Sequence, residues 1–162
     1  AMPSVLKIFP KAVLVIIGDG SQKAKLKKLV ETMKISQSVN FLGTLSHSQL
    51  PEYYAEADVF VGLSEVEGLG VVFLEASSSG LPLVGTAIGG TADILLDGLT
   101  GIKVETDNMV ELSRAIVRIL RDDELNQRLS KNARDHAVKN FSWPRVAFRF
   151  AEVFNEILST SK

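Results

Sequence analysis

The sequence predicts an α/β fold, a Rossmann-like parallel sheet with helices on both faces. Short apolar runs rich in β-branched residues alternate with longer segments of helical periodicity, the pattern of parallel strands joined by right-handed crossovers. The first run, residues 12–17, is apolar throughout, and we expect a strand buried on both faces. With 162 residues, of which 46% are apolar, the chain suits one domain with a sizeable core.

The remaining strands and the helices between them follow in order. Four later apolar runs bounded by turn residues are expected to be strands: 39–43, 58–63, 81–86 and 100–104. A helix should follow the turn at residues 18–20, with Ser21 as its N-cap. Its apolar stripe consists of Leu26, Leu29, Val30 and Met33. The segment 48–57 is expected to be helical, with Pro51 in its first turn. The helix after residue 70 should end at Gly80, with Pro82 beyond it.

Helices make up the two ends of the chain. Residues 1–10 resemble the second half of a helix. After a cap at Asp107 or Asn108, an apolar stripe marks the first of three C-terminal helices, and Leu125 and Leu129 mark the second. The stripe consists of Leu112, Ile116, Ile119 and Leu120. Ser142 should cap the third helix, whose aromatic residues Trp143, Phe148 and Phe150 we expect to pack rather than to stack on a ligand.

Composition excludes several classes of function. A net charge of −1 gives no reason to expect nucleic acid as a partner, and membrane contact should be at most peripheral. Without cysteine and with two histidines, the chain offers no thiolate or His-rich metal centre, so no metal is expected. No apolar run approaches about 18 residues and no signal peptide is visible, so we expect a cytoplasmic protein.

The stretch "EVEGLGVVFLEASSSGLP", residues 65–82, carries the most chemistry. A strand leads through Gly68 and Gly70 into a helix whose unpaired N–H groups favour an anion such as phosphate. Glu67 and Glu75, with seven residues between them, flank this site, and a carboxylate can accept hydrogen bonds from neighbouring hydroxyls. One anion between two polyols describes a sugar nucleotide. The simpler alternatives are a tight turn for the glycines and a solvated helix face for Glu75.

At these residues the sequence resembles the C-terminal half of a retaining glycosyltransferase of the GT-B fold, in the glycosyltransferase group 1 family. Ser64, Glu67-Gly68-Leu69-Gly70 and Glu75-Ala76 match the family motif, with Leu69 in place of the usual phenylalanine. Other blocks resemble the family in the same order: "GDGSQKAKLKKL", "VNFLG", "YYAEADVFV", "SGLPLVGTAIGGTADIL", "DGLTGIKV" and "NARDHAVKNFSW".

The resemblance implies roles for these residues. Glu75 would hold the ribose of the donor, and Glu67, the candidate catalytic residue, would contact the donor sugar and orient it. The donor would be a UDP-, GDP- or ADP-sugar, without a cofactor or metal. Further donor-binding candidates are the turn residues Gly68, Leu69, Gly70, Val71 and Val72, the strand end Asn40, Phe41, Leu42 and Gly43 near the base, and Gly18.

The resemblance also implies that parts are missing from this chain. The family's C-terminal half opens with a strand and two diphosphate-binding cations that have no counterpart here, and the acceptor-binding N-terminal domain is absent. We therefore interpret residues 1–162 as a donor-binding domain, inactive alone, and as a fragment or a domain completed by another chain. Without the opening strand, strands 12–17 and 58–63 must pair directly, bind something else or leave a gap.

Two other functions remain open on the sequence alone. One is an epimerase acting on sugar nucleotides, and the other is a non-catalytic subunit that docks on a partner. Other candidates have simpler explanations. We expect His47 and His136 at the surface, Asp19 in a turn and Gly89-Gly90 in a turn near the cleft. The sequence Thr91-Ala92-Asp93 departs from the family pattern.

Overall fold

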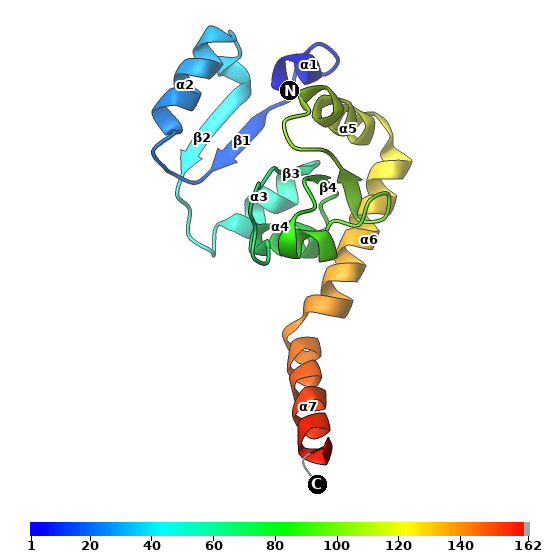
Figure 1. The fold of residues 1–162 in the computed structure, drawn as a ribbon. Coiled ribbons are helices and arrows are strands. Elements are labelled where there is room, and N and C mark those ends of the chain that lie inside the picture. Colours follow the sequence, from blue (N-terminus) through cyan, green and yellow to red (C-terminus); the bar gives the residue numbers. More distant parts are fainter. Residues whose placement is uncertain (161–162) are drawn as a thin grey trace.

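The strands form two separate parallel sheets in the computed structural model, which describes residues 1–160 (Figure 1). In the first sheet, β1 (Leu14–Ile17) pairs with β2 (Val39–Gly43), starting with Leu14 opposite Val39. In the second sheet, β4 (Leu83–Gly85) lies between β3 (Phe60–Gly62) and β5 (Gly101–Lys103). The predicted α/β class with parallel strands is confirmed, and each strand lies within its predicted run.

Helices connect and flank these strands. The α-helices are α1 (Met2–Leu6), α2 (Lys23–Thr32), α3 (Leu50–Glu56), α4 (Val71–Ser78), α5 (Met109–Arg121), α6 (Asp123–Phe141) and α7 (Trp143–Thr160). Two short 3₁₀ helices, η1 (Ser36–Ser38) and η2 (Gly89–Asp93), lie in connections. Of the two predicted caps for α5, Asn108 is the observed one, and its Oδ1 accepts from the N–H of Glu111. Gly80, at φ +81°, follows the end of α4 as predicted.

Of the three alternatives expected for β1 and β3, the structure excludes direct pairing. Strands β1 and β3 lie in different sheets, so direct pairing between them does not occur. The prediction that residues 12–17 are buried on both faces is wrong, because Val15 and Ile17 are 43% and 36% exposed. Within residues 1–160, β1 has a strand neighbour on one edge only, and exposed residues alternate along it with half-buried ones.

The core lies on the two faces of the second sheet. Leu83 and Val84 are consecutive residues of β4, so their side chains point to opposite faces. Leu83 belongs to a cluster with Phe73 and Ala76 of α4. Val84 belongs to a second cluster, whose other members are Val104, Leu112, Ala115, Ile119, Leu125 and Leu129. Helix α4 is therefore fixed on one face of the sheet, while α5 and the start of α6 cover the other.

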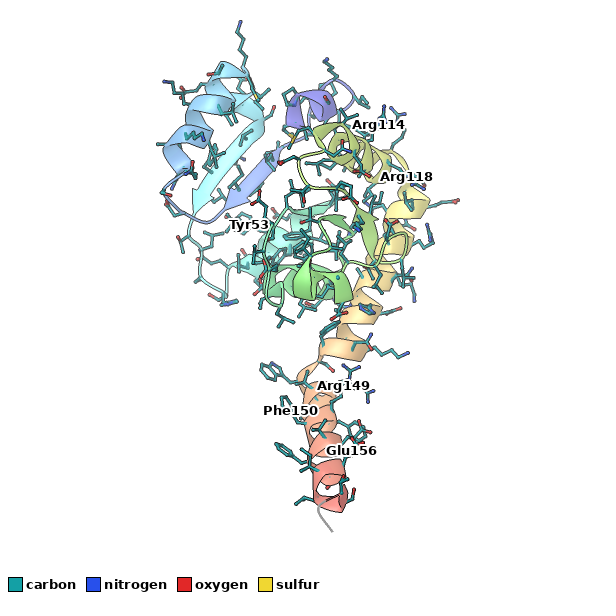
Figure 2. All side chains as sticks on the ribbon, viewed as in Figure 1. Tyr53, Arg114, Arg118, Arg149, Phe150 and Glu156 are labelled. Carbon is teal, nitrogen blue, oxygen red and sulfur yellow. The ribbon has the colours of Figure 1, made fainter. Side chains whose placement is uncertain are left out.

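Two helices have apolar faces that the described residues leave uncovered. No residue of α2 is buried, although its predicted stripe is present, and its N-cap is Gln22 rather than the predicted Ser21. Helix α7 projects away from the rest of the molecule, as its labelled Phe150 also shows (Figures 1 and 2). The predicted packing of Trp143, Phe148 and Phe150 does not occur within residues 1–160, because all three residues are exposed. Among residues 1–160, no helix combines the length and apolarity needed to span a membrane.

Candidate functional site

The turn before α4 has the geometry that its glycines predict. Gly70 is the N-cap residue at φ +75°, a left-handed conformation that favours glycine. A Cβ at Gly70 would lie 2.5 Å from Cγ2 of Thr91, so a larger residue has no room. Val71 and Val72 are the first two residues of the helix, and their N–H groups have no intrahelical acceptor. Both of these residues are exposed. The helix therefore presents free N–H donors at a solvent-accessible end.

A second glycine turn supports this first one. A Cβ at Gly89 would lie 2.1 Å from the carbonyl oxygen of Glu67, and a Cβ at Gly90 would lie 2.3 Å from that of Gly68. The N–H of Gly90 donates to the same oxygen of Gly68, at 3.1 Å. The turn at Gly89-Gly90 thus packs backbone to backbone against the loop that enters α4.

The carboxylate of Glu67 accepts hydrogen bonds from residues of its own turn. Its Oε1 accepts from the N–H of Gly70 at 3.2 Å, and its Oε2 accepts from the hydroxyl of Ser64 at 3.1 Å. A negative charge in this place is also favoured by the positive end of the helix dipole. Glu67 therefore stabilises the shape of the turn, and its expected contact with a sugar would be an additional role.

Thr91 stabilises the supporting turn, and its replacement gives a testable prediction. Its fully buried hydroxyl accepts from the N–H of Ile88 at 2.8 Å and lies within hydrogen-bond distance of two carbonyl oxygens. Thr91→Val keeps the shape but leaves that N–H unpaired, so we expect a loss of about 1–3 kcal/mol in the free energy of unfolding. Urea unfolding measures this loss. The exposed control Thr32→Val should change stability by less than about 0.5 kcal/mol, and equal losses would contradict the role of Thr91.

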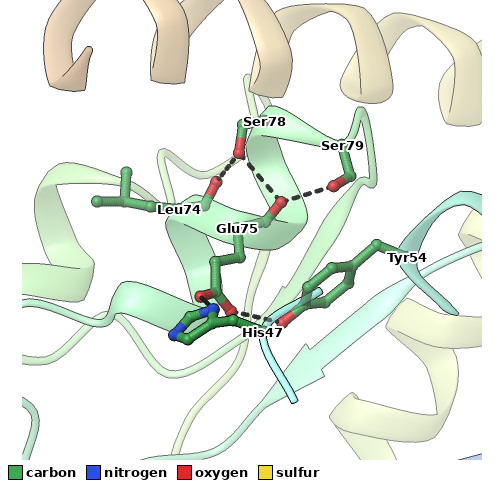
Figure 3. Close-up of polar contacts among 6 residues, drawn as sticks. All are labelled: His47, Tyr54, Leu74, Glu75, Ser78 and Ser79. Atoms are coloured by element: carbon green, nitrogen blue, oxygen red, sulfur yellow. Dashed lines mark hydrogen bonds and ion pairs between the residues drawn. The ribbon is translucent and has the colours of Figure 1, made fainter. Parts of the chain in front are cut away.

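Glu75 lies in the second turn of α4 with its carboxylate directed at two other side chains (Figure 3). Its side chain is only 22% exposed, so Glu75 does not lie on a fully solvated helix face. Oε2 accepts from the hydroxyl of Tyr54 at 3.0 Å, and Oε1 lies 3.4 Å from Nδ1 of His47. His47 is 85% exposed, so its predicted surface position is confirmed, but its contact with Glu75 was not anticipated.

Tyr54 titrates abnormally as a result of its position. Partial burial and then the hydrogen bond to Glu75 raise the pKa of Tyr54 above the ordinary tyrosine value of about 10. The folded chain therefore holds this proton more tightly than the unfolded chain does. The resulting contribution to stability is complete below about pH 10 and is lost as the pH rises further.

We expect Tyr54→Phe to reduce the alkaline loss of stability. Between about pH 9 and pH 11, the free energy of unfolding of the wild type should fall more than that of the variant. Urea unfolding at several pH values measures the difference. Tyr53→Phe is the matched control, because no hydrogen bond of the Tyr53 hydroxyl occurs among the described residues, and it should follow the wild type. Identical pH profiles for wild type and Tyr54→Phe would contradict this assignment.

The remaining predicted residues lie in β2 or directly after β1, in the first sheet. The N–H of Gly18 donates to the carbonyl oxygen of Gly43 at 2.7 Å, joining the ends of β1 and β2. A pocket of about 350 Å³ opens here, and its lining includes Gly18, Lys23 and Phe41. Asp19 forms the predicted turn. The Nζ of Lys23 and the N–H of Gly20 lower the pKa of the Asp19 carboxyl.

The predicted donor residues therefore form two groups. Asn40 and Leu42 lie on β2 outside the lining of the 350 Å³ pocket, and neither Glu67 nor Glu75 lines it. His47, on the loop that follows β2, contacts Glu75 and so connects the first sheet to the second group. Among residues 1–160, no group of three or more His, Asp or Glu side chains is placed to hold a metal ion.

Comparison with known proteins finds relatives that match almost the whole chain. The family model described as "Glycosyl transferases group 1" matches residues 1–136. A glycogen synthase of Mycobacterium tuberculosis is 31% identical over 154 residues, which are 95% of this chain and 37% of that protein. A GDP-mannose-dependent α-(1-6)-phosphatidylinositol monomannoside mannosyltransferase of Mycolicibacterium smegmatis is 31% identical over 163 residues, covering 96% of this chain and 42% of the enzyme.

The solved structures agree with the sequence comparisons. Sucrose-phosphate synthase from Thermosynechococcus elongatus superposes with a TM-score of 0.84 at 26% identity, and the match covers 98% of this chain and 42% of that one. The chain thus spans about two fifths of the length of the curated relatives that it matches.

Proposed function

The chain belongs to the glycosyl transferases group 1 family, and from this premise we propose that it is the part of a glycosyltransferase that binds the nucleotide-sugar donor. The observation that carries this proposal is the paired placement at α4. Free N–H groups at Val71 and Val72 lie at the helix start, and the largely buried carboxylate of Glu75 lies in the next turn. Together they offer a site for an anion beside a site for hydroxyls.

In this proposal the two ends of the donor bind to different parts of α4. The diphosphate lies at the helix N-terminus, where N–H groups and the helix dipole stabilise negative charge, including the charge that develops on the leaving group. Glu75 accepts hydrogen bonds from the ribose. Glu67 orients the transferred sugar rather than attacking it, and the reaction retains the anomeric configuration.

The relatives support the class of donor. The name of the mannosyltransferase states a dependence on GDP-mannose, a nucleoside diphosphate sugar. A ligand of that class has an anion between two polyols, and this order matches the order of groups along the turn and α4. The names of both relatives describe sugar transfer or polysaccharide synthesis, which favours a transferase over an epimerase.

We further propose that a second domain supplies the acceptor site. The chain covers about two fifths of its relatives, and the apolar face of α7 is uncovered in the described structure. The second domain would contact that face, and the complete enzyme would act in the cytoplasm without a metal. Cationic groups for the diphosphate would have to come from outside the motif described here.

A calorimetric screen of UDP-, GDP- and ADP-sugars against the 162-residue chain tests the proposal. One class of nucleotide should bind more tightly than the others, and transfer of its sugar to water or to an acceptor should not occur with this chain alone. Absence of binding by every nucleotide would contradict donor binding, and sugar transfer by the isolated chain would contradict the need for a second domain.

A further inference from the structure

We propose that Tyr54 is a positioning residue for donor binding: its hydroxyl fixes one oxygen of the Glu75 carboxylate, so that the other oxygen faces the ribose hydroxyls. This inference rests on the proposed role of Glu75. It adds a residue from α3, 21 positions earlier in the chain, that would not touch the donor itself.

The ring of Tyr54 is held by the core. It packs against the cluster that contains Phe73 and Leu83, and its centroid lies 6.3 Å from that of Phe60. Phe60 in turn meets the fully buried Phe73 edge to face, at 5.1 Å. A ring fixed in this way places its hydroxyl at a defined point beside α4.

The two oxygens of Glu75 have unequal neighbours (Figure 3). Oε2 accepts from the anchored hydroxyl of Tyr54 at 3.0 Å, whereas Oε1 lies 3.4 Å from the ring of His47, which is 85% exposed. A contact with so exposed a side chain is weak and easily displaced. Oε1 is therefore the oxygen that a pair of hydroxyls would take, and Tyr54 holds the carboxylate in the orientation that presents it.

The backbone of α4 supports the same orientation. The hydroxyl of Ser79 donates to the carbonyl oxygen of Glu75 at 2.9 Å, and Ser78 donates to the carbonyl oxygen of Leu74 at 2.6 Å. The main chain of Glu75 and its Oε2 are both held. Without the hydroxyl of Tyr54, the carboxylate could rotate. A free carboxylate spends part of its time turned away, and binding then has to fix it again.

The alternative is that the bond only joins α3 to α4, and a pair of ligands separates the two explanations. Binding of the nucleoside diphosphate that binds best among UDP, GDP and ADP is compared with binding of its 2′,3′-dideoxy analogue, for wild type, Tyr54→Phe, Tyr53→Phe and Glu75→Gln. We expect Tyr54→Phe to weaken the ribonucleotide roughly 3- to 10-fold and to leave the dideoxy analogue unchanged. Tyr53→Phe should match the wild type for both ligands.

The other outcomes separate failure of this inference from failure of the proposed role of Glu75. If Tyr54→Phe weakens both ligands equally, or neither, while Glu75→Gln weakens only the ribonucleotide, the inference is wrong and the proposed function stands. If the wild type binds no nucleotide, or if Glu75→Gln leaves the preference for the ribonucleotide intact, the proposed role of Glu75 is wrong and the inference fails with it.

Discussion

Replacing Glu75 by alanine is expected to weaken binding of the donor nucleotide by about 1–3 kcal/mol, roughly 5- to 150-fold in the dissociation constant. The variant loses a largely buried acceptor that would bond to the ribose, and the hydroxyl of Tyr54 loses its partner as well. Isothermal titration of wild type and variant with the preferred nucleoside diphosphate measures the loss.

Glu65→Ala is the matched control for this loss. Glu65 is an exposed acid on the same loop before α4, so its removal changes the local charge without removing the proposed contact. The Glu65→Ala variant should bind the nucleoside diphosphate as tightly as the wild type or slightly more tightly, because a negative charge near the diphosphate is lost. Equal weakening by both substitutions, or by neither, would show that Glu75 does not hold the ribose.

Replacing Phe73 by alanine is expected to have the largest effect on stability, a loss of about 3–5 kcal/mol in the free energy of unfolding. Phe73 is fully buried and fixes α4 on the sheet. Its ring fills the space beside two glycines, since a Cβ at Gly62 would lie 2.4 Å from its Cζ and one at Gly85 would lie 3.3 Å from its Cε1. Because glycine has no side chain, Gly62 and Gly85 cannot fill the cavity that Phe73→Ala leaves.

Urea unfolding of Phe73→Ala measures this loss, and Phe154→Ala provides the control of identical chemistry. Phe154 lies on α7 and is 62% exposed, so its truncation should change stability by less than about 0.5 kcal/mol. An equally large loss for Phe154→Ala would mean that α7 is packed in solution. A loss below about 0.5 kcal/mol for Phe73→Ala would mean that α4 does not depend on its buried ring.

The strands and the helix signals of this fold could be predicted from local sequence. Residues 39–43 form β2 as predicted, and Asn108 caps α5, because turn residues, caps and apolar periodicity act over a few neighbours. Burial could not be predicted in the same way. The run at Val15 is apolar enough for a strand with two covered faces, but the covering depends on elements that are distant or not described.

The site could be predicted only in part, for a similar reason. The spacing of Glu67 and Glu75 indicated the loop and the helix, and the glycines indicated a tight turn, but the left-handed conformation of Gly70 is known only from the structure. The partners of these acids were missed. Tyr54 occupies an apolar position of a helix pattern, and its hydroxyl meets Glu75 only because α3 and α4 pack together. The contact of Glu67 with Gly70 is local, and an acid three residues before the N-cap residue is a signal that could have revealed it.

The most direct test of the central claim is an amide NMR titration of the ¹⁵N-labelled chain with its preferred nucleoside diphosphate. If the diphosphate binds at the N-terminus of α4, the largest shift changes will include the amides of residues 68–72, at the turn and the start of the helix. Changes confined to the pocket at residues 16–23, with the amides of Val71 and Val72 unaffected, would contradict it.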